Sequence, residues 1–252
     1  MDMELSGNEM RLEGRNAVIE AFRSGKTIDK LFLLEGCKDG PIQTVLRDAK
    51  KTDTIITFVK KERLDQMSET GKHQGVIAIA AAYKYGTIEE MLEAAEKKGE
   101  PPFLILLDGI EDPHNLGSIL RTANQVGAHG VIIPKRRAVG LTAVVAKASA
   151  GAIHYTPVAK VTNLGKTIDS LKEKGIWFVC GDMAGEPMYQ TDLKGPIGLV
   201  IGNEGDGVSR LVKEKCDILA GIPMFGAIDS LNAAVAMGVL SYEIVRQRIS
   251  GK

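Results

Sequence analysis

The stretch FLILLDGIEDPHNLGSILRTA, residues 103–123, decides the fold of this chain. It opens with a continuous apolar run at 103–107, and its second half places apolar residues at helical spacing: Leu116, Ile119, Leu120 and Ala123. A fully apolar strand followed by an amphipathic helix is typical of a parallel sheet that helices cover on both faces. Further apolar runs follow at 130–133, 176–180, 197–201 and 218–222. We therefore predict an α/β domain with a parallel sheet over residues 103–252.

The last helix of this domain has the clearest periodicity. Its apolar residues recur at intervals of three and four, at Leu231, Ala234, Val235, Gly238, Val239, Tyr242 and Val245. This spacing predicts one continuous apolar stripe that ends before the basic Arg246 and Arg248.

A smaller α/β unit precedes this domain. Between Leu12 and Tyr83, helical patterns at 15–23 and 41–50 alternate with apolar runs at 31–34, 55–59 and 75–81. The next segment has apolar residues at helical spacing, including Met91, but it ends at Pro101 and Pro102, which cannot continue a helix. The sequence therefore predicts domains at 1–83 and 103–252 that are joined by a linker at 84–102.

Charge and composition restrict the function. Lysine plus arginine number 32 and aspartate plus glutamate number 32, so no global field draws the protein to nucleic acid and any RNA contact must come from local patches. The densest basic cluster after residue 103 is Lys135-Arg136-Arg137, which is either a phosphate contact or a solvated loop.

Cysteine usage and the N-terminus indicate the compartment. Cys37, Cys180 and Cys216 have no second cysteine or histidine at metal-ligand spacing, which predicts reduced thiols and no metal. Residues 1–13 lack the apolar stretch of a signal peptide, and no run approaches membrane-spanning length. We expect a cytoplasmic protein without membrane contact.

Three segments at strand ends carry more polar and glycine residues than a plain sheet requires, and ligands of α/β folds bind at those carboxyl ends. They read LDGIEDPHNLGSILRTA at 107–123, VIGNEGDGVS at 200–209 and IPMFGAIDSLNAAVA at 222–236. In this order and near this spacing they closely resemble the three signature motifs of the SpoU/TrmH family of RNA ribose 2′-O-methyltransferases. The resemblance covers residues 103–248, and residues 12–83 resemble the ribosomal-protein-like RNA-binding domain that many members carry.

The resemblance implies a fold, an activity and partners. It implies a SPOUT methyltransferase domain with a C-terminal trefoil knot, which no general rule of topology would predict because knots are nearly absent from proteins. It further implies a homodimer that transfers a methyl group from S-adenosylmethionine to an RNA ribose 2′-hydroxyl without a metal. The closest overall resemblance is to enzymes that methylate a guanosine in 23S rRNA, while similar relatives modify tRNA.

The resemblance also assigns site residues. The positions that match the catalytic set are Arg121, Asn115, Glu204, Ser230 and Asn232, and those that match the methyl-donor site are Gly202, Gly205, Ile222, Met224 and Leu231. Glycine at 202 and 205 would let the loop take positive φ and bring its backbone against the adenosine. Because a guanidinium has a pKa above about 12 and is a poor base, we expect Arg121 to bind phosphate and orient the hydroxyl. Ser230 and Asn232 are expected to shape the site, and Glu204 to organise the glycine loop or contact the substrate.

Other roles are open for the same residues. Asn115 and Ser230 are also good helix caps, Glu204 could be solvated in a turn, and Arg121 could be a surface charge. Two positions depart from the family pattern: Asp229 stands where relatives often have a second serine, and Phe225 where many have a small or basic residue. These departures concern the choice of RNA.

Two rival functions remain to be weighed. A dinucleotide-dependent oxidoreductase also has a glycine loop after a strand, but the glycines at 202, 205 and 207 do not form G-x-G-x-x-G and no acidic residue follows at the spacing that binds ribose. A non-catalytic RNA-binding or ribosome-assembly protein could keep the fold, although the presence of the whole polar set argues against it.

Overall fold

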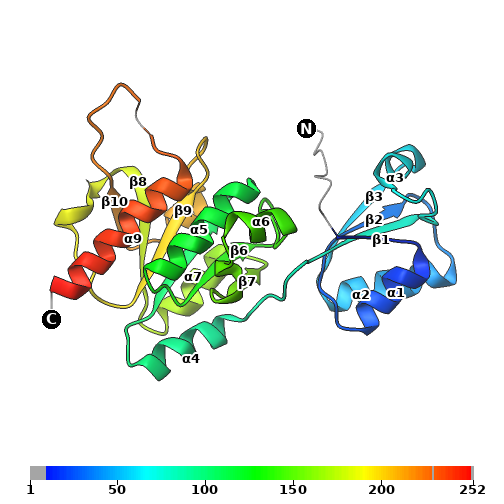
Figure 1. Cartoon of the computed structure of the whole chain (residues 1–252), viewed down its shortest axis with the longest axis horizontal. Helices are drawn as coiled ribbons and strands as arrows, with labels where there is room; N and C mark the ends of the chain where they lie inside the picture. Colours follow the sequence, from blue (N-terminus) through cyan, green and yellow to red (C-terminus); the bar gives the residue numbers. More distant parts are fainter. Residues whose placement is uncertain (1–9, 229, 251–252) are drawn as a thin grey trace. The chain divides into compact units, whose positions relative to one another are not determined.

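A computed structural model of the chain describes residues 10–228 and 230–250, which fold into two compact units (Figure 1). One unit comprises the described residues up to Lys84 together with 140–143, and the other comprises 85–139 and the described residues from 144. Asp229, which departs from the family pattern, lies outside the described residues, as do residues 1–9 of the first predicted domain and 251–252 of the second.

The N-terminal unit is a four-stranded mixed sheet in the order β1-β4-β2-β3. Its strands are β1 (Met10–Glu13), β2 (Ile28–Leu34), β3 (Ile55–Val59) and β4 (Val76–Ala80). Helices α1 (Arg15–Arg23) and α2 (Gly40–Lys51) pack on one face around Leu31, and α3 (Lys61–Met67) packs on the other around Phe32. Leu31 and Phe32 are neighbours in β2 and point to opposite faces, which is why each face has its own apolar core.

The C-terminal unit is a six-stranded sheet in the order β10-β8-β9-β5-β6-β7, and every pairing in it is parallel. The strands are β5 (Phe103–Asp108), β6 (Gly130–Pro134), β7 (Val158–Val161), β8 (Trp177–Pro187), β9 (Ile197–Gly202) and β10 (Ile218–Gly221). The predicted α/β class with a parallel sheet is therefore confirmed. The prediction missed β7, whose four residues include the charged Lys160.

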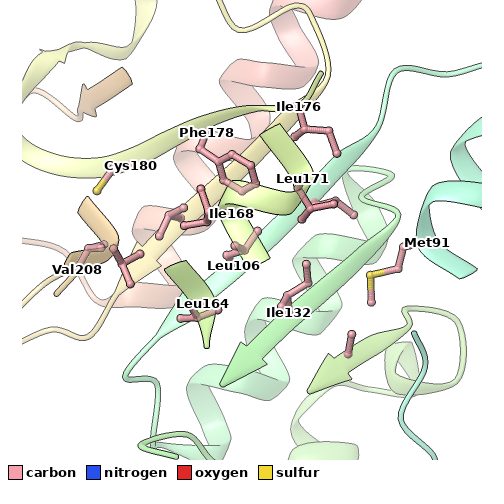
Figure 2. Close-up of a cluster of buried hydrophobic side chains, with 14 residues drawn as sticks. Met91, Leu106, Ile132, Leu164, Ile168, Leu171, Ile176, Phe178, Cys180 and Val208 are labelled. Carbon is pink, nitrogen blue, oxygen red and sulfur yellow. The ribbon is translucent and has the colours of Figure 1, made fainter. Parts of the chain in front are cut away.

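Helices cover both faces of this sheet. On one face, α4 (Ile88–Lys98), α7 (Leu164–Lys172) and α8 (Arg210–Lys213) enclose the buried core that Figure 2 shows, in which Phe178 and Ile132 of the strands meet Ile168 and Met91 of the helices. On the other face lie α5 (Pro113–Gln125) and α9 (Ala233–Ser250), which pack on each other, while α6 (Ala143–Ala148) follows β6. No helix among the described residues is long and apolar enough to cross a membrane.

Of the segment predicted as a linker, 84–102, residues 85–102 group with the C-terminal unit and Lys84 with the N-terminal one. The segment contains α4, whose Met91 and Ala95 are fully buried, and Thr87 and Glu90 form a capping box at its start. The change from one unit to the other therefore falls near residue 84. Prolines at 101 and 102 end the segment as predicted, but they stand before β5 and not at the edge of a domain.

The buried face of α9 differs from the predicted apolar stripe. Val235 and Tyr242 of that stripe are 51% and 54% exposed. The helix instead buries Met237, Leu240 and Ile244 together with polar residues, among them Gln247, whose amide donates to Thr191 O at 2.9 Å. The predicted stripe is therefore present but only partly buried, with Ala234 buried and Val235 and Tyr242 exposed.

Candidate active site

Three polar loops meet at one edge of the parallel sheet. They follow β5, β9 and β10, whose carboxyl ends point the same way because the strands are parallel. Asn115, after β5, donates from Nδ2 to Glu204 Oε1 at 3.0 Å. Asn232, after β10, donates from Nδ2 to Asn115 Oδ1 at 2.9 Å and to Glu204 Oε1 at 2.5 Å. One side chain from each of the three predicted motifs thus joins a single hydrogen-bonded cluster.

The same cluster contains the start of α9. Asn232 Oδ1 accepts from the backbone N–H groups of Ala234 at 3.0 Å and Val235 at 3.2 Å, so Asn232 caps this helix. The N–H of Ala233 donates to Glu204 Oε1 at 3.3 Å. A carboxylate at a helix N-terminus is favoured by the helix dipole, which helps to hold Glu204 in place.

These contacts decide between the alternatives left open for three residues. Asp112 caps α5 by accepting from His114 N at 2.8 Å, so Asn115 is free to reach Glu204. The cap of α9 is Asn232 and not Ser230. Glu204 stands in an exposed turn, but its Oε1 accepts from three donors, so the side chain is held in place and does not point freely into solvent.

The glycine loop after β9 is built by its own backbone. Asn203 Oδ1 accepts from Gly205 N at 2.9 Å and Asp206 N at 2.7 Å. A Cβ at Gly202 would lie 2.0 Å from the carbonyl carbon of Gly207, so only glycine fits there. The expectation that residues 202 and 205 take positive φ is wrong, because the left-handed residue of the loop is Gly207, with φ of 67°. Glycine is required at 202 by close packing and at 207 by conformation.

A cavity of about 230 Å³ opens beside this loop. All five residues predicted for the methyl donor line it, as do two of the predicted catalytic residues: Gly202, Gly205, Ile222, Met224, Leu231, Glu204 and Ser230. Asn115 and Asn232 do not line the cavity, but both bind Glu204 in its wall. Arg121 does not line it either. Its side chain is exposed on α5 and has no hydrogen bond or ion pair with another described residue.

The sequence analysis missed the wall that β8 contributes. Gly181, Asp182 and Met183 line the cavity, at the point where the strand leaves its buried run. Burial raises the pKa of Asp182, but hydrogen bonds from Lys213 Nζ and from Ala184 N outweigh it, and the pKa is held below its ordinary value. The signal was present: Gly181 and Asp182 directly follow the apolar run 176–180, as glycine and polar residues follow the other site strands.

Comparison with known proteins decides the family. Residues 102–242 match the model of the SpoU rRNA methylase family, and residues 11–86 match that of the RNA 2′-O ribose methyltransferase substrate-binding domain. The chain belongs to the SpoU rRNA methylase family. Like its family, it is an RNA ribose 2′-O-methyltransferase with S-adenosylmethionine as methyl donor, built on the SPOUT fold.

Individual relatives agree along the whole chain. A Bacillus subtilis (strain 168) protein named as a TrmH family tRNA/rRNA methyltransferase, YacO, is 54% identical over 236 residues, which are 93% of this chain and 94% of the relative. The SpoU methyltransferase AviRb of Streptomyces viridochromogenes, solved with its cofactor AdoMet, is 26% identical with a TM-score of 0.61 and covers 97% of this chain and 92% of its own. An AdoMet-bound rRNA methyltransferase of Sinorhizobium meliloti is 25% identical, with a TM-score of 0.58 and coverage of 95% and 87%.

The cavity suits this donor chemically. Ile201, Leu231 and Leu240 offer apolar walls for an adenine, and the backbone of the glycine loop offers polar groups without side chains in the way. Among the described residues, the lining contains the carboxylates of Asp182, Glu204 and Asp206 and no lysine, arginine or histidine, although Lys213 pairs with Asp182 from outside the lining at 2.6 Å. Glu204 and Asp206 form no ion pair with a described residue, and negative charge of this kind beside a cavity favours a ligand that carries a sulfonium.

Proposed function

We propose that this enzyme methylates the ribose 2′-hydroxyl of a guanosine in 23S rRNA. The observation that carries the proposal is the cluster of Asn115, Glu204 and Asn232, which fixes three motif loops around one acidic cavity. The choice of ribosomal RNA is supported by the match of residues 102–242 to the SpoU rRNA methylase family and by the likeness to the Sinorhizobium meliloti rRNA methyltransferase. The alternative substrate is tRNA, since the YacO relative is named for both.

We assign the site residues as follows. Gly202, Gly205, Ile222, Met224 and Leu231 hold the methyl donor, and Ser230, which also lines the cavity, hydrogen-bonds at the reacting centre. Glu204 and Asn232 keep the glycine loop and the start of α9 in register, with Asn115 as the bridge. Arg121 binds a phosphate next to the target ribose and orients its hydroxyl, and its charge is free for this role because no described residue neutralises it.

Positioning supplies most of the rate. S-adenosylmethionine brings a methyl group that is already activated by its cationic sulfur. The protein must hold the hydroxyl oxygen about 3 Å from that carbon and in line with the bond that breaks, which is worth several orders of magnitude in rate. Wall residues that are locked by hydrogen bonds, such as Glu204, keep the cavity in one shape and serve that purpose.

The enzyme acts as a homodimer in this proposal. An open groove of about 550 Å³ runs between α5 and α9, lined by Ser118, Thr122, Asn232, Ala234, Val235, Gly238, Val239 and Tyr242. It contains the apolar stripe that α9 leaves exposed, and a second copy of the chain is the occupant that the family resemblance implies. Tyr242→Asp should give a monomer in light scattering, whereas Tyr189→Asp, at a tyrosine of equal exposure outside the groove, should not. A dimer that survives Tyr242→Asp would place the interface elsewhere.

The N-terminal unit binds the RNA substrate, and the enzyme works in the cytoplasm, where that RNA is made.

A mass-spectrometric map of ribose methylation in a deletion strain tests which RNA is the target. We expect one guanosine of 23S rRNA to lose its 2′-O-methyl group and to regain it when the gene is restored. A loss confined to tRNA would select the alternative. Purified enzyme that binds RNA but transfers no labelled methyl group to it would favour the non-catalytic rival.

A further inference from the structure

Three arginines differ from all the others in the described part of the chain. Arg121, Arg136 and Arg137 have neither a side-chain hydrogen bond nor an ion pair with a described residue. The remaining eight are held by carboxylates, by backbone carbonyls or by contacts of their own: Arg11, Arg15, Arg23, Arg47, Arg63, Arg210, Arg246 and Arg248. A protein with zero net charge that leaves two adjacent guanidinium groups unpaired has a local cationic patch at that point.

The turn that carries Arg136 and Arg137 is fixed at both ends. Lys135 N donates to Val161 O of β7 at 2.8 Å, and Val139 N donates to Ile110 O at 3.0 Å. Between these anchors Arg137 has a φ of 53°, in the left-handed region that a residue with a side chain seldom adopts. Both arginines are exposed. The turn therefore presents two exposed guanidinium groups, unpaired among the described residues, from a backbone that is hydrogen-bonded at both ends.

The turn stands at the same sheet edge as the donor cavity. Asp108 pairs in register with Gly202, and Leu106 with Ile132, so continuing by two residues places Pro134 level with Asp108 and Gly202. At about 4.8 Å between strands, β6 lies about 10 Å from β9. An RNA strand whose target ribose reaches the cavity has its neighbouring phosphates within this distance.

Backbone contacts join the turn to the cavity wall. Ile110, which accepts from Val139, belongs to the short loop after β5, and Gly109 of that loop packs so closely on Asn203 that a Cβ there would lie 2.9 Å from Asn203 Nδ2. Asn203 in turn holds the glycine loop. The position of the arginines is thereby tied to the position of the cavity through two packed loops.

We infer that Arg136 and Arg137 form a phosphate-binding anchor that holds the RNA strand beside the donor cavity. Guanidinium groups bind phosphate oxygens through two parallel hydrogen bonds, and a preordered turn loses little entropy on binding. This inference rests on the proposed function, since it supposes that RNA is the substrate. The anchor acts on RNA binding and leaves methyl-donor binding unchanged.

The test is RNA affinity as a function of salt, with a 23S rRNA fragment as the probe, for wild type, Arg136→Ala/Arg137→Ala and Arg136→Lys/Arg137→Lys. Each lost phosphate contact lowers the slope of log K against log salt by about 0.7 for single-stranded RNA, so the double alanine variant should lose about 1.4 from the slope. We expect at least tenfold weaker binding near physiological salt, unchanged affinity for S-adenosylmethionine, and recovery of most of the slope in the lysine variant. Arg210→Ala, which removes an exposed arginine paired with Glu214, is the matched control and should keep the wild-type slope.

Several outcomes would overturn the inference. A double alanine variant with the wild-type slope would show that the turn does not touch phosphate. A salt-dependent loss of dimer without a change in slope would assign the turn to a protein contact. Thermal unfolding at the wild-type temperature distinguishes a lost contact from a lost fold, and the lysine variant keeps the charge if alanine disturbs the turn. Failure of the proposed function has a different signature, in which wild-type enzyme binds the fragment but methylates no RNA.

Discussion

Replacement of Gly202 by alanine tests whether the glycine loop is shaped by close packing. The added Cβ would lie 2.0 Å from Gly207 C, 2.1 Å from Val208 N and 2.2 Å from Gly207 O, all of them backbone atoms. Because ordinary contacts begin near 3.4 Å, the chain at residues 207–208 would have to move by about 1.4 Å. No side-chain rotation can relieve the clash.

The expected cost follows from this displacement. Overpacking of a well-packed site costs about 1–3 kcal/mol, which corresponds to roughly 5- to 150-fold in an equilibrium constant. The moved backbone lines the donor cavity, so we expect the cost to fall on donor binding, with affinity for S-adenosylmethionine weakened about 10- to 100-fold in calorimetry. The part of the cost that falls on folding should lower the unfolding temperature by about 2–4 °C for each kcal/mol, and β9 itself stays paired.

Gly205→Ala is the matched control. Its Cβ would have Asn203 Oδ1 at 3.6 Å as its nearest neighbour, an ordinary contact, and its φ is not positive. We expect a change in donor affinity of less than about threefold. Wild-type affinity in Gly202→Ala would refute the packing argument. Equal losses in both variants would show that the donor itself, and not the fold of the loop, excludes the methyl group.

Three further predictions concern the cluster, the domain boundary and pH. Glu204→Ala removes an oxygen that accepts from three donors and should slow single-turnover methyl transfer about 10- to 100-fold. Glu204→Gln should have a smaller effect, because its amide oxygen still accepts. A wild-type rate in Glu204→Ala would show that the cluster does not contribute to catalysis. Met91→Ala should lower the free energy of unfolding of the C-terminal unit by about 2–5 kcal/mol in urea, because α4 is part of its core. A decrease below about 0.5 kcal/mol would support the interpretation of this segment as a linker. Burial raises the pKa of Glu13, but hydrogen bonds from Ser68 and Thr70 outweigh it and lower the pKa from 4.5 to about 2. The contribution of the Glu13 carboxylate to stability is therefore complete above about pH 4.5 and is lost as the pH falls to about 2. Glu13→Gln should lower the unfolding temperature at pH 7 and have little effect near pH 2. A difference in unfolding temperature between variant and wild type that stays the same at both pH values would contradict this.

The sequence predicted the parts of the fold that continuous apolar runs specify. Five strands of the parallel sheet begin within one or two residues of the start of a predicted apolar run: β5, β6, β8, β9 and β10. A parallel strand that is buried on both faces is apolar at every position, which makes its start easy to recognise in the sequence. Short or polar elements were missed. Helix α3 has the sequence KERLDQM and buries only Leu64 and Met67. Two apolar positions are too few to show the spacing of three and four residues that indicates a helix.

Burial was harder to predict than secondary structure. In α9, Glu243 and Gln247 are buried because Arg246 and the backbone of Thr191 and Leu193 satisfy them, which no periodicity can show. The domain boundary in the segment 84–102 stays a prediction, and the packing of this segment shows a related difficulty. Prolines indicate where a helix stops, but whether the helix before them packs on the next domain depends on tertiary contacts such as that of Met91.

The candidate site was predicted from its motifs and not from physical periodicity. Spacing along the chain could not bring Asn115 and Asn232 together across 117 residues, whereas the parallel strands do so at one sheet edge. The residues of β8 were missed because the glycine and aspartate after its apolar run form a signal of only two residues, and the structure shows that this strand lies beside β10 at the site. The trefoil knot that the resemblance implies stays a prediction.

A crystal structure of the enzyme with S-adenosylmethionine tests the central claim most directly. We expect the adenosine to lie between the glycine loop at 202–207 and the cavity residues Ile222, Met224 and Leu231, with Glu204 still bound to Asn115 and Asn232. A donor bound on another surface, or crystals that take up no donor at saturating concentration, would contradict the claim.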